Sequence, residues 1–332
     1  MSSSDPPRVL SGITPSGALT LGNYLGALKR FVDGQGAQEG FFFVADLHAL
    51  TTPCEPGRAR ELTLQTAALF IASGLDPEAS TVFVQSHVRA HAELAYLLES
   101  TAYVGELGRM IQFKEKGGRP RTRASLFTYP CLMAADILLY DARRVPVGGD
   151  QSQHVELCRD LAVRFNRDHG ETFVVPELAP AALATRVTDL ADPAVKMSKS
   201  APDKASGVVR MLDDADAIRR KVIRAVTDSD GEVRYDPETK PGVSNLVDIL
   251  AAIHGGDPHD LAATFASYGS LKQATADCVV DALEPIQRTY RLLREDSPRL
   301  AAALALGAAR ASRQAEPVLR RAREAIGLVT TV

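Results

Sequence analysis

The chain has 332 residues, of which 45% are hydrophobic and 24% charged, and its net charge is −3. This length suggests about two domains with a sizeable core, and the composition argues against a disordered or fibrous chain. The net charge excludes a protein that is basic overall, so a nucleic-acid partner would have to be held by local basic patches. Tryptophan is absent from the sequence.

Cysteine usage and the amino-terminal segment indicate a compartment. The four cysteines are far apart and form no C-x-x-C pair, which argues against a zinc ribbon, an iron–sulfur cluster or a disulfide framework. The first residues lack the basic and apolar regions of a signal peptide, and no apolar run is long enough to cross a bilayer. We therefore expect a cytoplasmic protein with no membrane segment and no resident metal.

The first half of the chain alternates short apolar strands with amphipathic helices. This alternation is typical of βαβ crossovers and predicts a doubly wound parallel sheet, Rossmann-like, with helices on both faces. The predicted strands are residues 8–13, 41–44, 81–85, 145–147 and 173–175. The predicted helices are residues 24–32, 58–73, 126–140 and 151–166, the third of them inside a mostly helical insertion at 91–140.

The second half changes character near residue 213. Asp213 is a suitable N-cap for a helix that runs to residue 226, and further helical patterns follow at 244–254, 271–294 and 313–326. We therefore predict a Rossmann-like domain at 1–205 and an all-helical domain at 206–332, whose last helix could pack back on the first domain. The segment 301–332 carries five arginines against two glutamates, either as a phosphate-facing patch or as a solvated amphipathic helix.

A glycine-rich segment at 11–23 joins the first strand to the first helix. This junction is where a doubly wound sheet binds its ligand, and a helix start supplies free N–H groups that favour phosphate. Gly22 would let a base or ribose approach the backbone, while Thr20 and Asn23 could hydrogen-bond a phosphate. The alternative is a glycine-rich turn with an ordinary helix cap.

Two pairs of lysines stand out because the chain has only nine lysines. Lys196 and Lys199 lie in the segment K-M-S-K-S, and Lys114 and Lys116 lie in Q-F-K-E-K. Flexible ammonium groups with small neighbours suit a mobile phosphate clamp that follows charge on a departing pyrophosphate. The alternative for K-M-S-K-S is a solvated linker.

A single carboxylate interrupts the most apolar helical segment. Asp136 follows Tyr129 and Met133 at helical spacing, so the three side chains share one face. An apolar pocket with one acceptor suits an aromatic amino acid that bears a ring N–H or O–H. Because an unpaired buried carboxylate is costly, the alternative is an internal ion pair of Asp136 with Arg143 or Arg144.

The predicted strand at 145–147 runs into the polar segment G-G-D-Q. At this edge of the sheet, Asp150 and Gln151 could hold a ribose, a metal or an α-amino group. Asp150 could equally be a simple N-cap. The remaining histidines, His87, His91, His254 and His259 among them, show no triad or metal-ligand spacing, and we interpret them as structural.

Taken in this order, the segments resemble the class I aminoacyl-tRNA synthetases, and among them the tryptophanyl family. T-L-G-N at 20–23 resembles the family's variant of its first signature, and K-M-S-K-S at 196–200 is similar to the second. V-G-E-L-G-R-M, Q-F-K-E-K, Y-P-C-L-M-A-A-D-I-L-L-Y and V-P-V-G-G-D-Q also resemble segments of this family. So do A-V-T-D-S-D-G at 225–231 and K-P-G-V-S-N-L at 240–246, and the likeness extends from about residue 9 to 328.

The resemblance implies an activity and a set of site residues. Tryptophan would react with ATP to give tryptophanyl-adenylate and pyrophosphate, and the tryptophanyl group would then pass to tRNA(Trp). The implied amino-acid pocket is Tyr129, Met133, Asp136 and Gln151, with Asp136 accepting the indole N–H. The implied ATP site is Thr14, Pro15, Ser16, Gly22, Asn23, Gly148, Gly149, Asp150, Val187, Lys196, Met197, Ser198, Lys199 and Ser200. The implied catalytic groups are Thr20, Asn23, Lys116, Lys196 and Lys199, with Mg²⁺ assisting the lysines at the triphosphate.

The resemblance also implies an assembly, and it has two departures. The family is homodimeric, so residues 91–140 would be the dimer interface, residues 196–200 a mobile loop, and the helical domain the reader of the anticodon. The family usually has Gln at the position of Thr14 and Glu at that of Gly149. The alternatives are a tyrosyl-tRNA synthetase, a nucleotidyltransferase of the same fold, and a non-enzymatic RNA-binding relative.

Overall fold

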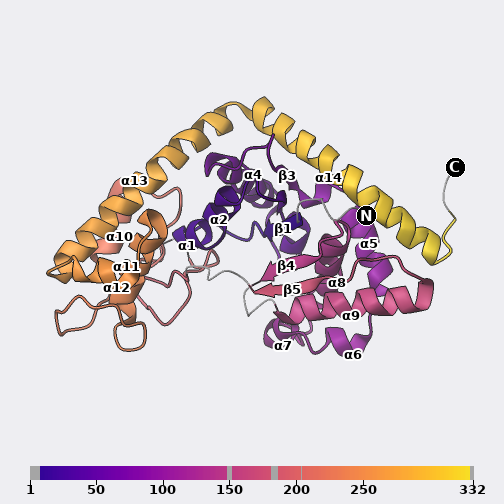
Figure 1. The fold of residues 1–332 in the computed structure, drawn as a ribbon, viewed down its shortest axis with the longest axis horizontal. Helices are drawn as coiled ribbons and strands as arrows, with labels where there is room; N and C mark the ends of the chain where they lie inside the picture. The colour runs from indigo at the N-terminus through magenta and orange to yellow at the C-terminus, as the bar shows by residue number, and fades with distance from the viewer. Residues whose placement is uncertain (1–7, 148–151, 181–185, 203, 330–332) are drawn as a thin grey trace.

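Five parallel strands form the centre of the computed structural model, which describes residues 8–147, 152–180, 186–202 and 204–329. Strands β1 (Arg8–Ile13), β2 (Glu39–Val44) and β3 (Thr81–Val84) pair in this order, with Leu10 opposite Phe41 and Phe41 opposite Thr81. Strands β4 (Arg144–Val147) and β5 (Glu177–Pro180) form a second parallel ladder, and β4 lies beside β1 (Figure 1). The spatial order is therefore 3-2-1-4-5, with the order reversing beside β1.

Helices cover both faces of this sheet. Along β2, Phe42 and Val44 belong to one buried cluster together with α4 (Pro56–Ala72). Phe41 and Phe43 belong to the other, with α5 (Ala90–Glu99), α8 (Ser125–Leu138) and α9 (Ser152–His169). A strand with no polar face needs cover on both sides. The prediction of a doubly wound parallel sheet is confirmed.

Short helices follow the strands at the edge where a ligand is expected. After β1 the chain forms α1 (Leu21–Asn23), the five-residue π-helix η1 (Tyr24–Leu28) and α2 (Lys29–Asp33). After β2 comes α3 (Asp46–Ala49), and after β3 comes the 3₁₀ turn η2 (Gln85–His87). Two further short helices, α6 (Val104–Leu107) and α7 (Ile111–Lys116), precede α8.

Four helices, α10 (Ala215–Ile223), α11 (Pro241–His254), α12 (Pro258–Ala263) and α13 (Tyr268–Glu295), gather at one end of the molecule (Figure 1). Their buried side chains, including Leu246 and Leu271, belong to the same cluster as Val44 and Leu69 of the sheet domain. The apolar core is therefore continuous between the helical end and one face of the sheet.

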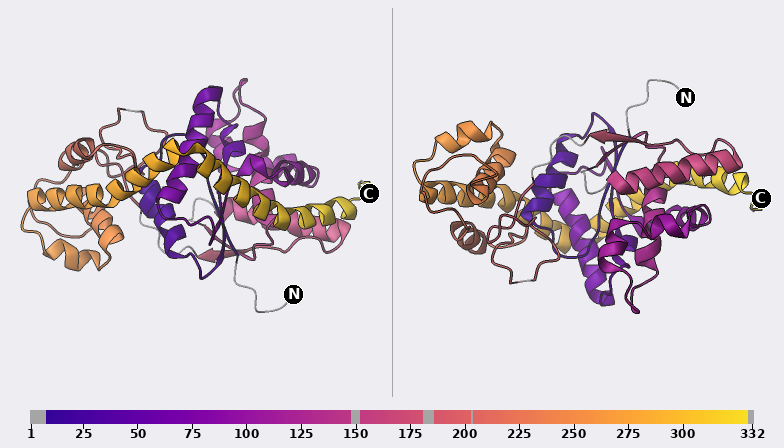
Figure 2. Two further views of the ribbon diagram at one scale, coloured as in Figure 1. Left: turned by 90° about the horizontal axis from the view of Figure 1, so that it is seen from above. Right: turned by 90° about the horizontal axis from the view of Figure 1, so that it is seen from below.

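The last helix, α14 (Ser297–Ala325), returns along the sheet domain (Figure 2). It packs across β3 and α5, with Leu304 in one core cluster and Ala311 in the other. Gly307 lies between them, and a Cβ added there would be 1.8 Å from the carbonyl oxygen of Val82. The helix thus crosses the sheet at an edge strand, in contact with the strand backbone.

Three of the six arginines of α14 bind the sheet domain. Arg310 pairs with Glu78 at 3.1 Å, Arg321 with Asp141 at 3.1 Å, and Arg323 with Glu93 at 3.3 Å. For these three side chains the ion pairs favour the alternative, an amphipathic helix whose charges bind neighbouring elements of the protein. Arg313 and Arg320 are exposed.

Three predicted elements need correction. Residues 173–175 are not a strand, because the Asn166 side chain binds both the N–H and the C=O of Phe173 at 2.8 Å and takes the place of a ladder. Strand β5 follows instead at Glu177–Pro180. Asp214 rather than Asp213 caps α10, through a bond from Ala217 N–H of 2.7 Å. The helix predicted at 313–326 is only the second half of α14.

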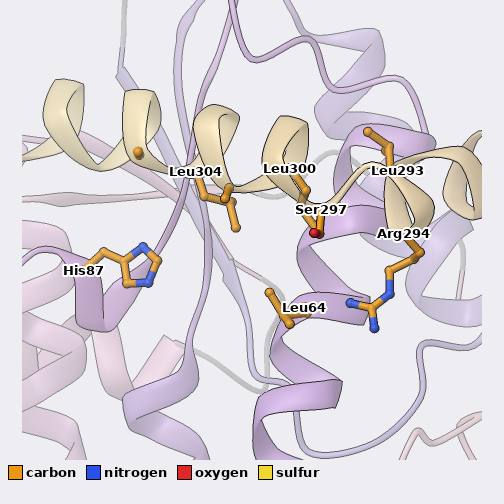
Figure 3. A pocket seen from close by; sticks show the side chains of 9 residues that line it. Leu64, His87, Leu293, Arg294, Ser297, Leu300 and Leu304 are labelled. Carbon is orange, nitrogen blue, oxygen red and sulfur yellow. The ribbon is translucent and has the colours of Figure 1, made fainter.

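A small apolar cavity of about 200 Å³ lies where the α13–α14 junction meets α4 and η2 (Figure 3). Leu64, Leu293, Leu300 and Leu304 supply its apolar wall, and His87 and Arg294 lie at its border. Arg294 is already paired with Glu61 at 2.7 Å. None of the helices in the described parts of the chain combines the length and the apolar character that crossing a membrane requires.

Gly307 gives a stability prediction. Gly307→Ala places a methyl group against the β3 backbone, so we expect the free energy of unfolding to fall by about 1–3 kcal/mol despite alanine's better helix propensity. Gly269→Ala in α13 is the matched control, because its Cβ would meet only Ser267 Oγ at 3.7 Å. Urea denaturation measures both variants. Equal stability of the two variants would contradict the proposed contact.

Candidate active site

One cavity of about 950 Å³ brings together nine of the site residues predicted from the sequence. Its wall includes the segments that follow β1 and β2, together with side chains of α7, α8 and the loop around residue 198. The predicted site residues that line it are Thr14, Ser16, Asn23, Lys116, Tyr129, Met133, Asp136, Lys196 and Lys199. The smaller cavity of Figure 3 contains none of them.

Asp136 is buried, with 3% of its surface exposed, and three side chains donate hydrogen bonds to it. Oδ1 accepts from Gln85 Nε2 at 2.7 Å and from His91 Nδ1 at 2.6 Å. Oδ2 accepts from His48 Nε2 at 2.8 Å. The alternative in which Asp136 pairs with an arginine is wrong, because Arg143 and Arg144 are exposed and two histidines and an amide fill that role.

These donors keep the buried carboxyl group ionised. Burial alone would raise the pKa of Asp136, but the hydrogen bonds and charges of His48 and His91 outweigh it, and the pKa is lowered. A carboxylate offers about four lone-pair positions to donors. Three are filled, two on Oδ1 and one on Oδ2, so Oδ2 can accept one further N–H or O–H group from the cavity.

The Gln85 amide is held by the backbone. Its Oε1 accepts from Leu47 N–H at 3.2 Å, which directs Nε2 toward Asp136. Gln85 is fully buried at the end of β3, and Leu47 follows β2. The ends of two neighbouring strands therefore fix the carboxylate that α8 supplies.

Aromatic and apolar groups surround this acceptor. Tyr129 lies about two helical turns before Asp136 on α8, and its hydroxyl makes a 2.5 Å hydrogen bond with His154 Nε2 of α9. Burial raises the pKa of Tyr129 to about 12, so its phenol stays protonated. Leu126, Met133 and Ile137 complete the apolar wall.

Thr20 and Asn23, the two candidate phosphate ligands of the glycine-rich segment, have different roles in the structure. Thr20 is fully buried and caps α1, since its hydroxyl donates to Asn23 Oδ1 at 3.1 Å and receives Asn23 N–H at 3.4 Å. Thr20 N–H also binds Asn23 Oδ1. Asn23 lines the cavity, and the capping bonds hold its oxygen, which leaves its NH₂ group for a ligand. Thr20 therefore positions Asn23 and does not itself line the cavity among the described residues.

Lys199 reaches the same segment from the K-M-S-K-S loop. Its Nζ donates to the Thr14 carbonyl oxygen at 2.5 Å. A Cβ at Gly17 would be 2.1 Å from the Lys199 carbonyl oxygen, so only glycine permits this approach. Burial and, second, the Lys196 charge lower the pKa of Lys199 to about 8. Lys196 and Lys116 are exposed and line the cavity.

The loop is anchored to the helical half of the chain. Thr188 pairs with Lys196 in an isolated antiparallel bridge. The Asn245 side chain binds both backbone groups of Thr188, at 2.9 Å to its N–H and 3.1 Å to its C=O. Asn245 belongs to the K-P-G-V-S-N-L segment, so α11 fixes the base of the lysine loop.

Other predicted ATP-site residues have distinct positions. Val187 and Met197 have buried side chains in the core, and Met197 N–H binds the Val187 carbonyl at 3.2 Å. Ser198 and Ser200 are exposed and joined by a 2.8 Å hydroxyl contact. Pro15 is buried and Gly22 half-buried. Gly148, Gly149, Asp150 and Gln151 lie outside the described residues, and within the described ranges no three His, Cys, Asp or Glu side chains form a metal site.

The sequence analysis did not identify His48, Gln85 or His91 as partners of Asp136, and its interpretation of His91 as a purely structural residue was incomplete. The sequence did contain a signal for these residues. A buried Asp136 requires hydrogen-bond donors, and the segments that follow β2 and β3 are the places from which donors can reach it. His48 follows β2 in A-D-L-H, and Gln85 and His91 follow β3 in Q-S-H-V-R-A-H.

The geometry thus combines one ionised acceptor in an apolar pocket with a group of lysines beside a helix start. Comparison with known proteins gives the family. Residues 2–284 match the family described as tRNA synthetases class I (W and Y). The chain belongs to this family.

Individual members of the family are similar over nearly the full chain. Tryptophan–tRNA ligase 1 of Streptomyces avermitilis is 52% identical over 328 residues, which cover 97% of this chain and 99% of that protein. The tryptophanyl-tRNA synthetase structure from Mycoplasma pneumoniae is 35% identical with a TM-score of 0.88, covering 97% and 98%. The Campylobacter jejuni structure, in complex with ADP and tryptophan, is 33% identical with a TM-score of 0.82, covering 97% and 100%.

Lys199 gives a pH prediction for the free enzyme of this class I synthetase. Above a pH of about 8 its ammonium group loses the proton, so kcat/KM for ATP in amino-acid-dependent pyrophosphate exchange should decline on the alkaline side. Lys199→Arg keeps its charge at all these pH values and should lack this decline, whatever its overall rate. Lys196→Arg is the matched control and should retain the decline. If kcat/KM for ATP declined in the same way at alkaline pH in the wild-type protein and in both variants, the assignment of this decline to Lys199 would be contradicted.

Proposed function

We propose that the protein is a tryptophan–tRNA ligase, which activates L-tryptophan with ATP and transfers it to tRNA(Trp). The observation that carries this proposal is Asp136. It is an ionised acceptor with one free position on Oδ2, in a pocket walled by Tyr129 and Met133. An indole presents one N–H group on a large apolar ring system, and such a donor completes the bonding of the carboxylate.

The first step requires charge stabilisation rather than proton transfer. A carboxylate oxygen of tryptophan attacks the α-phosphorus of ATP, the bond from that phosphorus to the bridging oxygen breaks, and pyrophosphate leaves. Lys199, Lys196 and Lys116 would stabilise the negative charge of the triphosphate and the leaving pyrophosphate. Asn23 would donate from its NH₂ group, and Mg²⁺ would enter with the nucleotide as part of the MgATP substrate.

In the second step the terminal ribose hydroxyl of tRNA(Trp) attacks the carbonyl carbon of tryptophanyl-adenylate, and AMP leaves. The helical part of the chain, α10–α13, would read the anticodon. Residues 1–205 would be the catalytic domain, with residues 196–200 a loop that moves as pyrophosphate departs. The cytoplasm, where tRNA and ATP are available, would be the place of action.

A tyrosyl enzyme is less supported, although a phenol O–H could also reach Oδ2. The similar full-length proteins described above are tryptophan enzymes. A nucleotidyltransferase of the same fold has no need for a helical domain whose core is continuous with the sheet domain. Asn23, Lys196 and Lys199 line the cavity together, which favours an enzyme over a non-catalytic relative.

We also propose a homodimer that uses the 91–140 region. Tyr96 on α5 and Tyr103 and Val104 at the start of α6 are 72%, 58% and 75% exposed. Three exposed large apolar side chains within nine residues of sequence are a feature that a partner chain could cover. Arg164 of α9 stacks on Tyr103 with its guanidinium carbon 4.1 Å from the ring centre, which holds that ring in place.

Amino-acid-dependent exchange of pyrophosphate into ATP tests the function. We expect exchange with tryptophan and at most trace exchange with tyrosine, followed by charging of tRNA(Trp). Asp136→Asn keeps the side-chain volume but weakens the acceptor, and it should lower kcat/KM for tryptophan by about 10²-fold or more. Exchange with tyrosine but not tryptophan, or the absence of charging of any tRNA, would overturn the proposal.

The dimer is tested by sedimentation. The wild-type chain should sediment at twice 35.6 kDa, and Val104→Asp should shift it toward the monomer by burying a charge in the interface. Val163→Asp is the matched control on the neighbouring helix α9, with an exposed side chain outside 91–140. A monomeric wild-type protein at micromolar concentration would contradict the dimer.

A further inference from the structure

His91 is a fully buried histidine that does not line the active-site cavity. It lies on α5 behind Asp136, among the rings of Phe43, Phe83 and Tyr140, whose centres are 5.6–5.9 Å away. Both of its ring nitrogens are used. Nδ1 meets Asp136 Oδ1 at 2.6 Å, and Nε2 meets the Tyr140 hydroxyl at 2.8 Å.

The partners of the ring show which of its nitrogens has to donate. Burial, together with the charge of Asp136, raises the pKa of Tyr140 well above its usual value, so its phenol remains a donor. Because the ionised Asp136 can only accept, Nδ1 of His91 carries a proton, while Nε2 and the Tyr140 hydroxyl share the second hydrogen bond. Nδ1–H in turn donates to Asp136 Oδ1. The two hydrogen bonds thus connect Tyr140, through His91, to the carboxylate.

This chain has a consequence for the atom that faces the cavity. Gln85 and His91 occupy both acceptor positions of Oδ1, while Oδ2 has His48 and one unused position. Because Nδ1 carries the proton, the carboxyl group has to stay an acceptor rather than become a donor toward His91. An acceptor oxygen of fixed direction distinguishes a ring that bears N–H from an isosteric ring without it.

We propose that His91, with Tyr140 behind it, is a positioning pair that fixes Asp136 as the acceptor for the ring N–H of the amino-acid substrate. The pair itself touches no substrate and sets the selectivity through Asp136. This inference rests on the proposed function, since it assigns a role in choosing tryptophan.

The test compares two substrates in pyrophosphate exchange. L-tryptophan carries the ring N–H, and β-(benzothiophen-3-yl)alanine has sulfur in its place. His91→Leu removes the donor at similar volume and should lower the ratio of the two kcat/KM values by about tenfold or more, through loss with tryptophan alone. Tyr140→Phe should lower the ratio in the same direction by a smaller factor, and it remains informative if His91→Leu does not fold.

His91→Asn is the matched conservative variant. Its amide can donate from a position close to that of Nδ1, so it should recover most of the wild-type ratio. If His91 only filled space, the smaller asparagine would not restore the ratio. If His91 acts as a donor to Asp136, asparagine should restore it.

The pH profile gives a second measure. The titratable groups that face Asp136 are His48, His91, Tyr140 and Cys158, and no other charged side chain is among its described interactions. With His91 replaced by leucine, burial remains and one donor is lost, so the acid limb of kcat/KM for tryptophan should move to higher pH. The limb for the sulfur analogue should stay in place.

Equal losses with both substrates, or an unchanged ratio and acid limb in both His91→Leu and Tyr140→Phe, would overturn the positioning role. Failure of the wild-type protein to activate tryptophan would instead overturn the proposed function. The two failures are therefore distinguishable within one set of assays.

Discussion

A carboxylate buried in an apolar interior is unstable unless donors surround it, and much of the sheet domain is arranged around that constraint at Asp136. The donors come from three places: α3 after β2, the turn after β3, and helix α5. Helix α8 brings the carboxylate to them. Because the donors fill all but one acceptor position, the packing that stabilises Asp136 also defines the single bond that a substrate ring can make.

At the lysine loop, in contrast to Asp136, the surroundings disfavour the charge of the side chain. Lys199 is held against the Thr14 carbonyl in a position where burial and Lys196 disfavour its charge. A phosphate placed nearby would restore that charge and compete for the ammonium group. Gly17 permits the close approach of the two loops, and Asn245 fixes the base of the lysine loop from the helical half. The proposed nucleotide site is thus connected to α11 through the base of the lysine loop.

Much of the fold could be predicted from the sequence, because buried parallel strands and the helices between them have strong local patterns. Phe41–Val44 is apolar on both faces and can only be a covered strand. Residues 173–175 have the same apolar character, but Asn166 binds the backbone N–H and C=O of Phe173, and no local pattern reveals that. The length of α14 was underestimated because its first half is rich in alanine and contains Gly307, where the helix meets the β3 backbone.

The site was predicted less completely than the fold. The sequence indicated that Asp136 is exceptional, yet its partners are distant in the chain: His48 precedes it by 88 residues and His91 by 45. Thr20 and Asn23 were both read as ligands, whereas the capping geometry assigns the hydroxyl to the helix and only the amide to the cavity. Such distinctions depend on three-dimensional contacts that residue type and spacing do not specify.

A crystal structure with bound L-tryptophan tests the central claim most directly. The account predicts the indole nitrogen about 2.9 Å from Oδ2 of Asp136, with the bonds from His48, Gln85 and His91 all retained. An indole nitrogen that faces another group, with Oδ2 left without a ligand bond, would contradict it.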